Sequence, residues 1–588
     1  MKFHPAAQNE RRCTPALPWL ALFAIVVCAN HARAQDFEHY RPRTPESSSG
    51  EMLPLDEPTP AAGDDRVLID ELKGLLIVDH PSKVLDRPAR GDGVRFDLND
   101  YSPVLDSSEF NGIANRYLGG KVSIRRLNEL AREVVMLYRQ SGQPVVDVSI
   151  PEQDISKGVV QLVVTEAYIG EIRVESNYFN PCRLTQKLCT TPGGPIYESQ
   201  LMEDLRYLNL NPYREVDLRL TPGDEFGATS VVFEVNDRRP VSVYAGYEDT
   251  GNQSTMLERT IYGVHWGNAF DRDHSLGYQY TASPDFWDLE VHSASYAIPT
   301  RNRNELVMYG SHATLNSLIA PLFPSSGFAT ELAFRYYYDL YPGTCCPRDC
   351  LERRLIFGFD FRRTNSDLIF GQNVVFNSLA DIGQVVVGYD SRREDWLGVR
   401  RLGITGFFSP GGLTSFNNDA AFSALQPGAS AEYIYARMFY ERTAILPSCW
   451  QLYGKVTGQL SEATLLSSEQ LGLGGFNSIR GYDMRIANAD QGWIVNLELR
   501  TPVADFYPHC RRHDLQGLIF LDYGEVFRHA QLPAPAPNHY DLASVGVGFR
   551  YAIHQRLSVR CDYGWQLREL LPGIGKDSRF HIGAVATF

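Results

Sequence analysis

Alternation of polar and apolar residues dominates the chain from residue 241 to its last residue. Segments of roughly ten residues repeat this alternation between turns, which predicts a mainly β fold and is the signature of an outer-membrane β-barrel. A stretch at 463–490, rich in Gly, separates two groups of segments. We expect sixteen strands, eleven before this stretch and five after it, starting near residues 241, 257, 273, 287, 303, 329, 353, 382, 398, 430, 451, 491, 517, 540, 556 and 579.

The faces of these segments distinguish a barrel from a soluble sandwich. In 556–565 the apolar residues share one face, while the other face holds Arg, Ser, Asp and Gly. The segment from Trp493 to Leu499 behaves alike, with Asn496 and Glu498 on the polar face. A soluble sandwich would not place charged residues so regularly on its hidden side. An even strand number puts both barrel ends in the periplasm, so 463–490 becomes the sixth extracellular connection.

Residues 67–239 show a different pattern that occurs twice. In the first copy, Ser123 is a candidate cap for a helix that Gly142 ends, and strands follow at 146–150 and 160–164. On this helix Ile124, Leu127, Ala131, Val134 and Tyr138 share one face. The second copy has a strand at 172–174, a helix through Leu201, Leu205 and Leu208, and strands at 216–220 and 231–235. We therefore expect two small α+β domains, 67–166 and 167–239, before a barrel at 240–588.

The first 34 residues have the features of a signal peptide. Basic residues precede an apolar run, and Ala32-Arg33-Ala34 has the form of a cleavage site. A lipoprotein site at Cys28 is disfavoured, because Val27 replaces the small residue that it needs. Residues 35–66 are rich in Pro, Ser, Glu and Asp and are expected to be a disordered linker or possible plug segment.

Composition narrows the function further. The 48 Gly, 31 Tyr and 12% aromatic content suit strands ringed by interfacial aromatics. A net charge of −14 argues against nucleic-acid binding. The chain contains no phosphate-binding Gly-Lys loop, H-E-x-x-H or G-x-S-x-G motif, so we expect no enzyme activity, no cofactor and no metal.

Eight cysteines remain after the signal peptide, in a compartment where pairing is the default. Cys182 and Cys189 close a short loop and are the best disulfide candidate. A metal site there would need further ligands nearby, and the sequence offers none. The strand count places Cys561 on the lipid face. The same count assigns a further group, of open pairing, to periplasmic turns: Cys345, Cys346, Cys350, Cys449 and Cys510.

The stretch 463–490 is long for a connection and is more apolar than a disordered surface loop. We expect it to fold into the lumen, where its Arg480 would need a carboxylate partner. The strand near 518–524 provides Asp522 on its lumen face, beside Phe520 and Gly524, while the intervening residues face lipid. A bidentate pair between Arg480 and Asp522 follows. The alternative, a glycine turn with a solvated Arg, stays open on these residues alone.

Taken together, these features resemble the two-partner secretion transporters, the hemolysin activation and secretion (ShlB/FhaC/HecB) family of the POTRA-and-barrel superfamily. That family has two periplasmic POTRA domains, a sixteen-stranded barrel, a V-R-G-Y type motif on an inward-folded sixth loop and an F-x-D-x-G motif on a partner strand. The matching residues are Ile479, Arg480, Gly481 and Tyr482 for the loop motif, and Phe520, Asp522 and Gly524 for the strand motif. The first small domain is also similar, through Leu137-Tyr138 and 150–154.

The resemblance implies an outer-membrane translocator of a Gram-negative bacterium. It would bind a large secreted partner, such as an adhesin or cytolysin, through the POTRA domains and pass it through the barrel without ATP. Outer-membrane lipid and the barrel-assembly machinery would be further partners, with the terminal Phe588 as assembly signal. A barrel-assembly insertase of the same superfamily is the alternative; a passive porin leaves the two small domains unexplained.

Overall fold

The computed structural model describes residues 41–45, 64–251, 256–300, 303–320, 323–340, 350–370, 373–507, 512–529, 537–570, 573 and 575–588. The expected signal peptide and most of the linker therefore lie outside the described residues, as do Cys345, Cys346 and Cys510. The chain forms two compact units, which divide between Arg239 and Pro240, and residues 41–45 belong to the second unit.

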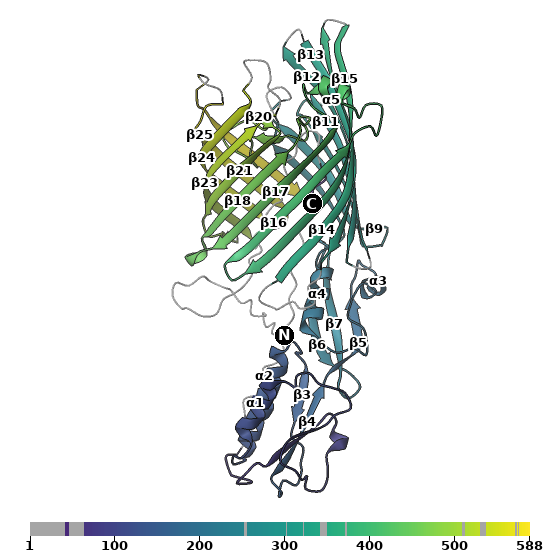
Figure 1. Cartoon of the computed structure of the whole chain (residues 1–588), viewed down its shortest axis with the longest axis vertical. Helices are drawn as coiled ribbons and strands as arrows, with labels where there is room; N and C mark the ends of the chain where they lie inside the picture. Colours follow the sequence, from purple (N-terminus) through teal and green to yellow (C-terminus); the bar gives the residue numbers. More distant parts are fainter. Residues whose placement is uncertain are drawn as a thin grey trace, which may run out of the picture. The chain divides into compact units, whose positions relative to one another are not determined.

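The second unit is a closed antiparallel barrel (Figure 1). Two of its labelled strands, β21 and β22, pair with successive parts of the same edge of β23, so the described residues form sixteen strands, as predicted. The strands are β8 (Val241–Glu248), β9 (Arg259–Ala269), β10 (His274–Ala282), β11 (Leu289–Pro299), β12 (Glu305–Ala320), β13 (Phe323–Asp339), β14 (Cys350–Phe370), β15 (Asn373–Asp395), β16 (Gly398–Pro410), β17 (Glu432–Ile445), β18 (Gln451–Ser461), β21 (Gln491–Arg500), β22 (Ala504–Phe506), β23 (His513–Phe527), β24 (His539–Ile553), β25 (Leu557–Gln566) and β26 (Ser578–Thr587).

Several strand starts differ from the expected ones. Strands β13 and β15 begin at Phe323 and Asn373, earlier than the alternation predicted, because backbone pairing continues into polar sequence. Cys350 is the first residue of β14 and not part of a turn. Cys449 lies in the short helix η2 (Pro447–Cys449), which connects β17 to β18. A further helix, α5 (Asp419–Leu425), lies between β16 and β17.

Side-chain exposure along the strands separates the two barrel faces. On β23, Ile519 and Leu521 are 55% and 46% exposed, whereas Phe520 and Asp522 are buried. Cys561 lies in register with Phe549 and Ile582, and its small side chain is buried between its neighbours. Strand β26 pairs with β8 to close the barrel, and the backbone of Phe588 extends this seam through two hydrogen bonds with Val243.

The first small domain contains a four-stranded sheet in the order β2-β1-β4-β3. Ser123 caps the predicted helix by accepting a hydrogen bond from the Arg126 backbone. Ile124, expected on the buried face, is exposed because it lies in the first turn of that helix. The elements are β1 (Gly74–Val78), η1 (Pro81–Lys83), β2 (Gly93–Asp97), α1 (Ser108–Tyr117), α2 (Ile124–Gln140), β3 (Val146–Ser149) and β4 (Val159–Glu166).

Tyr138 on α2 shows how this domain buries a polar group. Its hydroxyl donates to Glu166 at 2.7 Å and lies 3.0 Å from the Ser102 hydroxyl. Burial raises the pKa of Tyr138 well above its usual value. The phenol therefore stays neutral and ties the helix to the end of β4.

The second small domain has the same order of elements without the additional strand. Its sheet has the order β5-β7-β6, so β5 is an edge strand where β1 of the first domain is covered by β2. Its elements are β5 (Tyr168–Glu175), α3 (Pro181–Thr185), α4 (Glu198–Leu208), β6 (Arg214–Pro222) and β7 (Ala228–Asp237).

The predicted disulfide between Cys182 and Cys189 is wrong for this structure. Cys182, in helix α3, is a free and exposed thiol. Two backbone N–H groups, of Cys189 and Thr190, donate to the buried carboxylate of Asp204 on α4. This attachment fixes the course of the segment without a covalent bridge. In the described part of the chain, no helix is long and apolar enough to cross a membrane.

Candidate functional site

The connection from β18 to β21 is a folded structure. It contains a short hairpin formed by β19 (Leu471–Leu473) and β20 (Ala487–Ala489). The hairpin and the loop tip pack on side chains of β21, β23 and β24 in a buried apolar cluster. The members of this cluster are Leu471, Leu473, Ile479, Tyr482, Ala487, Ala489, Ile494, Val526 and Leu542. The loop therefore lies against the inner wall, as the sequence predicts.

Arg480 and Asp522 form the predicted pair. The Nε of Arg480 donates to Oδ2 of Asp522 at 2.8 Å, and Nη2 donates to Oδ1 at 2.8 Å. The backbone N–H of Arg480 also donates to Oδ2 at 3.1 Å, and both side chains are almost completely buried. Asn496 on β21 donates to the same carboxylate at 2.8 Å. Asp522 thus accepts from the guanidinium fork, the loop backbone and the neighbouring strand.

Two further acids surround the Arg480 guanidinium. Glu498 on β21 accepts from Nη1 at 2.6 Å, and Asp562 on β25 lies 3.8 Å from the same atom. The Phe520 ring lies below the guanidinium, with its centroid 3.6 Å from Cζ. Arg500 contacts the other carboxylate oxygen of Glu498, and Arg550 contacts the same oxygen of Asp562 that faces Arg480. Three cations and three anions therefore balance, which is what a weakly hydrated cluster requires.

Backbone contacts hold the loop tip as closely as the ion pair does. A Cβ added to Gly564 would lie 2.7 Å from the Gly481 nitrogen, so only glycine fits at this point of β25. Gly481 has a φ of 91°, which favours glycine in the loop as well. The nitrogen of Gly481 donates to His581 at 3.1 Å, and its carbonyl accepts from Gln566 at 2.7 Å.

The remaining motif residues complete the seat of the loop. Tyr482 is buried, and its hydroxyl lies between two acceptors for its one proton, the carbonyl oxygens of Ala543 at 2.9 Å and Arg568 at 2.6 Å. A Cβ on Gly524 would meet the side chains of Leu473 and Ile479 at 2.8 and 3.1 Å. The role of Gly524 is therefore to make room for the loop, and the six other motif residues contact the loop or belong to it.

Sequence reasoning placed Glu498 and Asp562 on the polar faces of their strands but did not connect them to Arg480. The signal was present, since both are acids on lumen faces near the end of the chain. Register between β21, β23 and β25 was missing. Asn496 on β21 pairs with Asp522 on β23, and Asp562 on β25 pairs with Gly548 on the intervening strand β24. The register of these strands brings the three acids together, and the sequence does not specify it.

The N-terminal residues 41–45 also lie in the barrel unit, against its inner wall. The Arg43 nitrogen donates to the Tyr244 hydroxyl at 3.0 Å, and its guanidinium pairs with Glu248. The Arg41 guanidinium lies over the Tyr309 ring at 3.9 Å. This is the described part of the segment for which a linker or plug was expected.

The arrangement is suited to holding a loop, and its chemistry is that of ion pairing. In the part of the chain that the structure describes, no group of three or more His, Cys, Asp or Glu could hold a metal ion. The carboxylates around Arg480 are each occupied by guanidinium or amide donors. The site can therefore change state only when the loop moves.

Comparison with known proteins agrees with this geometry. Residues 411–551 match the family described as haemolysin secretion/activation protein ShlB/FhaC/HecB, and residues 93–167 match the ShlB-type POTRA domain. The Heme/hemopexin transporter protein HuxB of Haemophilus influenzae (strain 86-028NP) is 24% identical over 78% of this chain and 80% of its own. The outer membrane transporter CdiB of Dickeya dadantii is 22% identical over 80% of this chain and 81% of its own. The solved structure of CdiB from Escherichia coli has a TM-score of 0.67 at 16% identity, covering 92% and 94% of the two chains.

Two POTRA-type domains followed by a sixteen-stranded barrel with an inward loop define an outer-membrane translocator whose POTRA domains are periplasmic. The matches of barrel, first POTRA domain and relatives are consistent with each other. The chain therefore contains a barrel segment similar to the ShlB/FhaC/HecB haemolysin secretion/activation proteins and a ShlB-type POTRA domain, and the relatives HuxB and CdiB are transporters by name.

Proposed function

We propose that this transporter receives an extended partner at its POTRA domains and passes it through the barrel, and that the sixth loop shifts to let it pass. One observation carries the proposal: the loop lies within the lumen and is held there by ion pairs at separate points, so one part of it can shift while another stays in place. Periplasmic transport without ATP then takes its direction from folding of the partner outside the cell. The seam residue Phe588 is proposed to be recognised by the barrel-assembly machinery before insertion into lipid.

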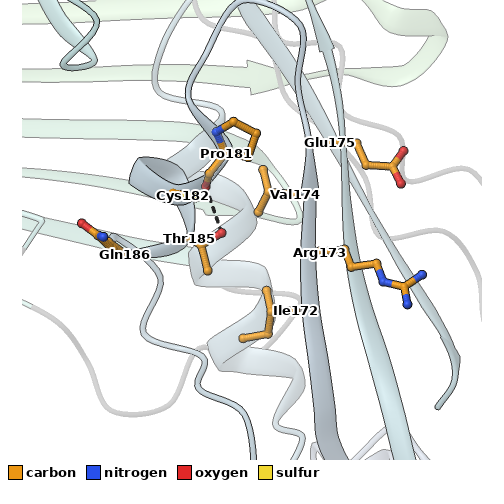
Figure 2. A pocket seen from close by; sticks show the side chains of 8 residues that line it. All are labelled: Ile172, Arg173, Val174, Glu175, Pro181, Cys182, Thr185 and Gln186. Atoms are coloured by element: carbon orange, nitrogen blue, oxygen red, sulfur yellow. Dashed lines mark hydrogen bonds between the residues drawn. The ribbon is translucent and has the colours of Figure 1, made fainter. Parts of the chain in front are cut away.

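A docking position for the partner is available beside β5 of the second POTRA domain. A groove of about 570 Å³ runs between this strand and helix α3 (Figure 2). Ile172 and Val174 point toward the helix in this view, and Arg173 and Glu175 point away from it. An extended segment could add to such an edge through backbone hydrogen bonds and insert side chains into the groove. The equivalent edge of the first domain is already paired with β2.

Removal of the gene product tests the function. We expect that deletion depletes one large protein from the culture medium and leaves other outer-membrane proteins at normal amounts. The measurement is quantitative proteomics of medium and outer-membrane fractions. Loss of many barrel proteins at once would instead establish an insertase, the alternative reading of the same architecture.

The docking position has its own test. Ile172→Gln and Val174→Gln should lower the amount of partner in the medium, because both side chains point toward α3 within the groove. Arg173→Gln is the matched control, since it lies on the same strand and points away from α3. Circular dichroism of the purified variants would verify folding. Equal export by all three variants would exclude this groove as the docking edge.

A further inference from the structure

A second charged residue of the sixth loop is as deeply buried as Arg480. Glu469 is 1% exposed and accepts a hydrogen bond from the Tyr435 hydroxyl at 2.5 Å and another from Gln384 at 3.2 Å. Its carboxylate also pairs with the guanidinium of Arg362. Its backbone oxygen accepts from Arg437 at 2.8 Å. Strands β14, β15 and β17 thus all reach this one loop residue.

Arg362 is itself built into the wall. It is 1% exposed, on β14, and has a second acid, Glu331 on β13, at 3.4 Å. A buried guanidinium needs such compensation, because leaving it unpaired is costly. Loss of Glu469 from its position would leave Arg362 with less than its full set of acids. The position of Glu469 is therefore specified by charge and not by packing alone.

The two charged ends of the loop contact different stretches of the barrel wall. Arg480 contacts acids on β21, β23 and β25, whereas Glu469 contacts β14, β15 and β17. Strand β14 is half of the barrel circumference from β25 in the strand order. On the N-terminal side of Glu469, Leu465 and Leu466 pack with Phe422 and the two tyrosines Tyr433 and Tyr435. The loop is thus fixed to two separate stretches of the inner wall.

The two ends differ in how they are held. At the Arg480 end, loop backbone touches wall backbone, as Gly481 and Gly564 show. At the Glu469 end, long side chains from the wall reach the loop. Long side chains can follow a moving partner or change rotamer, whereas a backbone contact of this kind must separate as a unit. The Glu469 end is consequently the easier one to release.

We propose that Glu469 and Arg362 are positioning residues for transport, and that their pair is the contact that separates when the lumen opens, while Arg480 stays docked. The claim that these residues act in transport rests on the proposed function as a translocator. The claim that their pair separates when the lumen opens concerns the barrel alone, and it can be measured without any partner protein.

Electrical conductance of the purified full-length protein in planar lipid bilayers tests the opening. Glu469→Gln and Arg362→Gln should each raise the fraction of time in the open state by about tenfold, as expected for loss of one charge-assisted hydrogen bond. Arg363→Gln is the matched control, because Arg363 is the next residue of β14 and pairs with Asp381 instead of the loop. Heat-modifiable migration on gels would verify that each barrel is closed.

Exchange of the two charges between Glu469 and Arg362 distinguishes loss of their ion pair from general damage to the barrel. The double variant Glu469→Arg with Arg362→Glu should return the open fraction toward that of the natural chain, whereas each single exchange should raise it. Conductance of both single variants equal to that of the Arg363→Gln control would overturn the proposal. Failure of the double variant to recover would overturn it as well, since general damage would then explain the single effects.

A crosslink distinguishes this proposal from the proposed function. Glu469→Cys with Arg362→Cys, bridged by a bifunctional maleimide, should block export relative to the same double variant capped with a monofunctional maleimide. Export through the crosslinked protein would show that the Glu469 end need not separate and would overturn this inference alone. Absence of any partner in the medium of the natural chain would instead contradict the function while leaving the conductance result interpretable.

Discussion

The two walls of the lumen that hold the sixth loop use different means. The wall of β21 to β25 presents Gly564, which lets the loop come into backbone contact, and Gly524, which makes room for the side chains of Leu473 and Ile479. The wall of β14 to β17 presents large polar side chains, such as Arg362 and Tyr435, that extend to a more distant part of the loop. Close backbone contact gives a fixed position, and reaching side chains give a contact that can be exchanged. One loop can therefore be both anchored and mobile.

The largest effect is expected at the Arg480 end. Arg480→Ala leaves Asp522 buried without its cation and Glu498 with Arg500 alone, at a cost of about 3 to 5 kcal/mol. We expect export of the partner to be abolished while the barrel still assembles, as measured by partner in the medium and heat-modifiable migration. Arg480→Lys should recover only part of the export, since an ammonium cannot form the two-pronged contact with Asp522. Normal secretion by the Ala variant would refute the role of this pair.

A steric change at the same wall should come next. In Gly564→Val the new side chain meets the Gly481 backbone, and such overpacking costs about 1 to 3 kcal/mol. We expect export to fall about tenfold, in line with a cost of this size. Gly406→Ala is the control, because the nearest atom to its new Cβ is the Val387 oxygen at 3.7 Å. Equal export by both variants would show that the backbone contact is dispensable.

A change in the wall of β14 to β17 should affect a different part of the loop. Tyr435→Phe removes one hydrogen bond to the charged Glu469, worth about 1.5 to 3 kcal/mol. Hydrogen exchange should accelerate in residues 464–470 and stay unchanged in 476–482. Mass spectrometry of peptides from the two segments measures this. Acceleration of both segments together would mean that the loop moves as one body, and the distinction between the walls would fail.

The smallest effect is expected for Arg550→Ala. The Arg550 side chain is 34% exposed, so solvent screens part of its charge, and we expect a smaller loss than for the buried Arg480 although its partner Asp562 is buried. Export and hydrogen exchange should remain close to those of the natural chain. A loss comparable with that of Arg480→Ala would show that charge balance of the whole cluster, and not the loop arginine alone, determines function.

Much of the first wall could be predicted from the sequence. Alternation with a period of two gave the strand number and put Asp522 on the lumen face, because side-chain direction follows directly from parity. The partners Glu498 and Asp562 were on the correct faces but required the register of three strands. The additional strand β2 was not expected, since its five residues, of which the last three are exposed, carry little apolar signal.

The contacts of Glu469 with the wall of β14 to β17, and the state of the cysteines, could not be predicted from the sequence. Glu469 precedes the Gly-rich motif in a polar stretch, and its partner Arg362 is more than a hundred residues away in the chain. No local pattern connects them, since only barrel closure brings β14 near the loop. The Cys182 and Cys189 pairing was inferred from spacing and compartment, but the position of Cys189 is determined by Asp204 on α4. Distant contacts outweighed local spacing in both cases.

The small strand β2 has a consequence for selectivity in a crowded compartment. Unfolded polypeptides in transit through the periplasm offer backbone groups to any open sheet edge, and an unprotected edge invites wrong pairings. By pairing with β1, β2 replaces the apolar edge Gly74–Val78 with its own edge, which carries the charged residues Arg95 and Asp97. Charged side chains on an edge strand disfavour pairing with unrelated passengers.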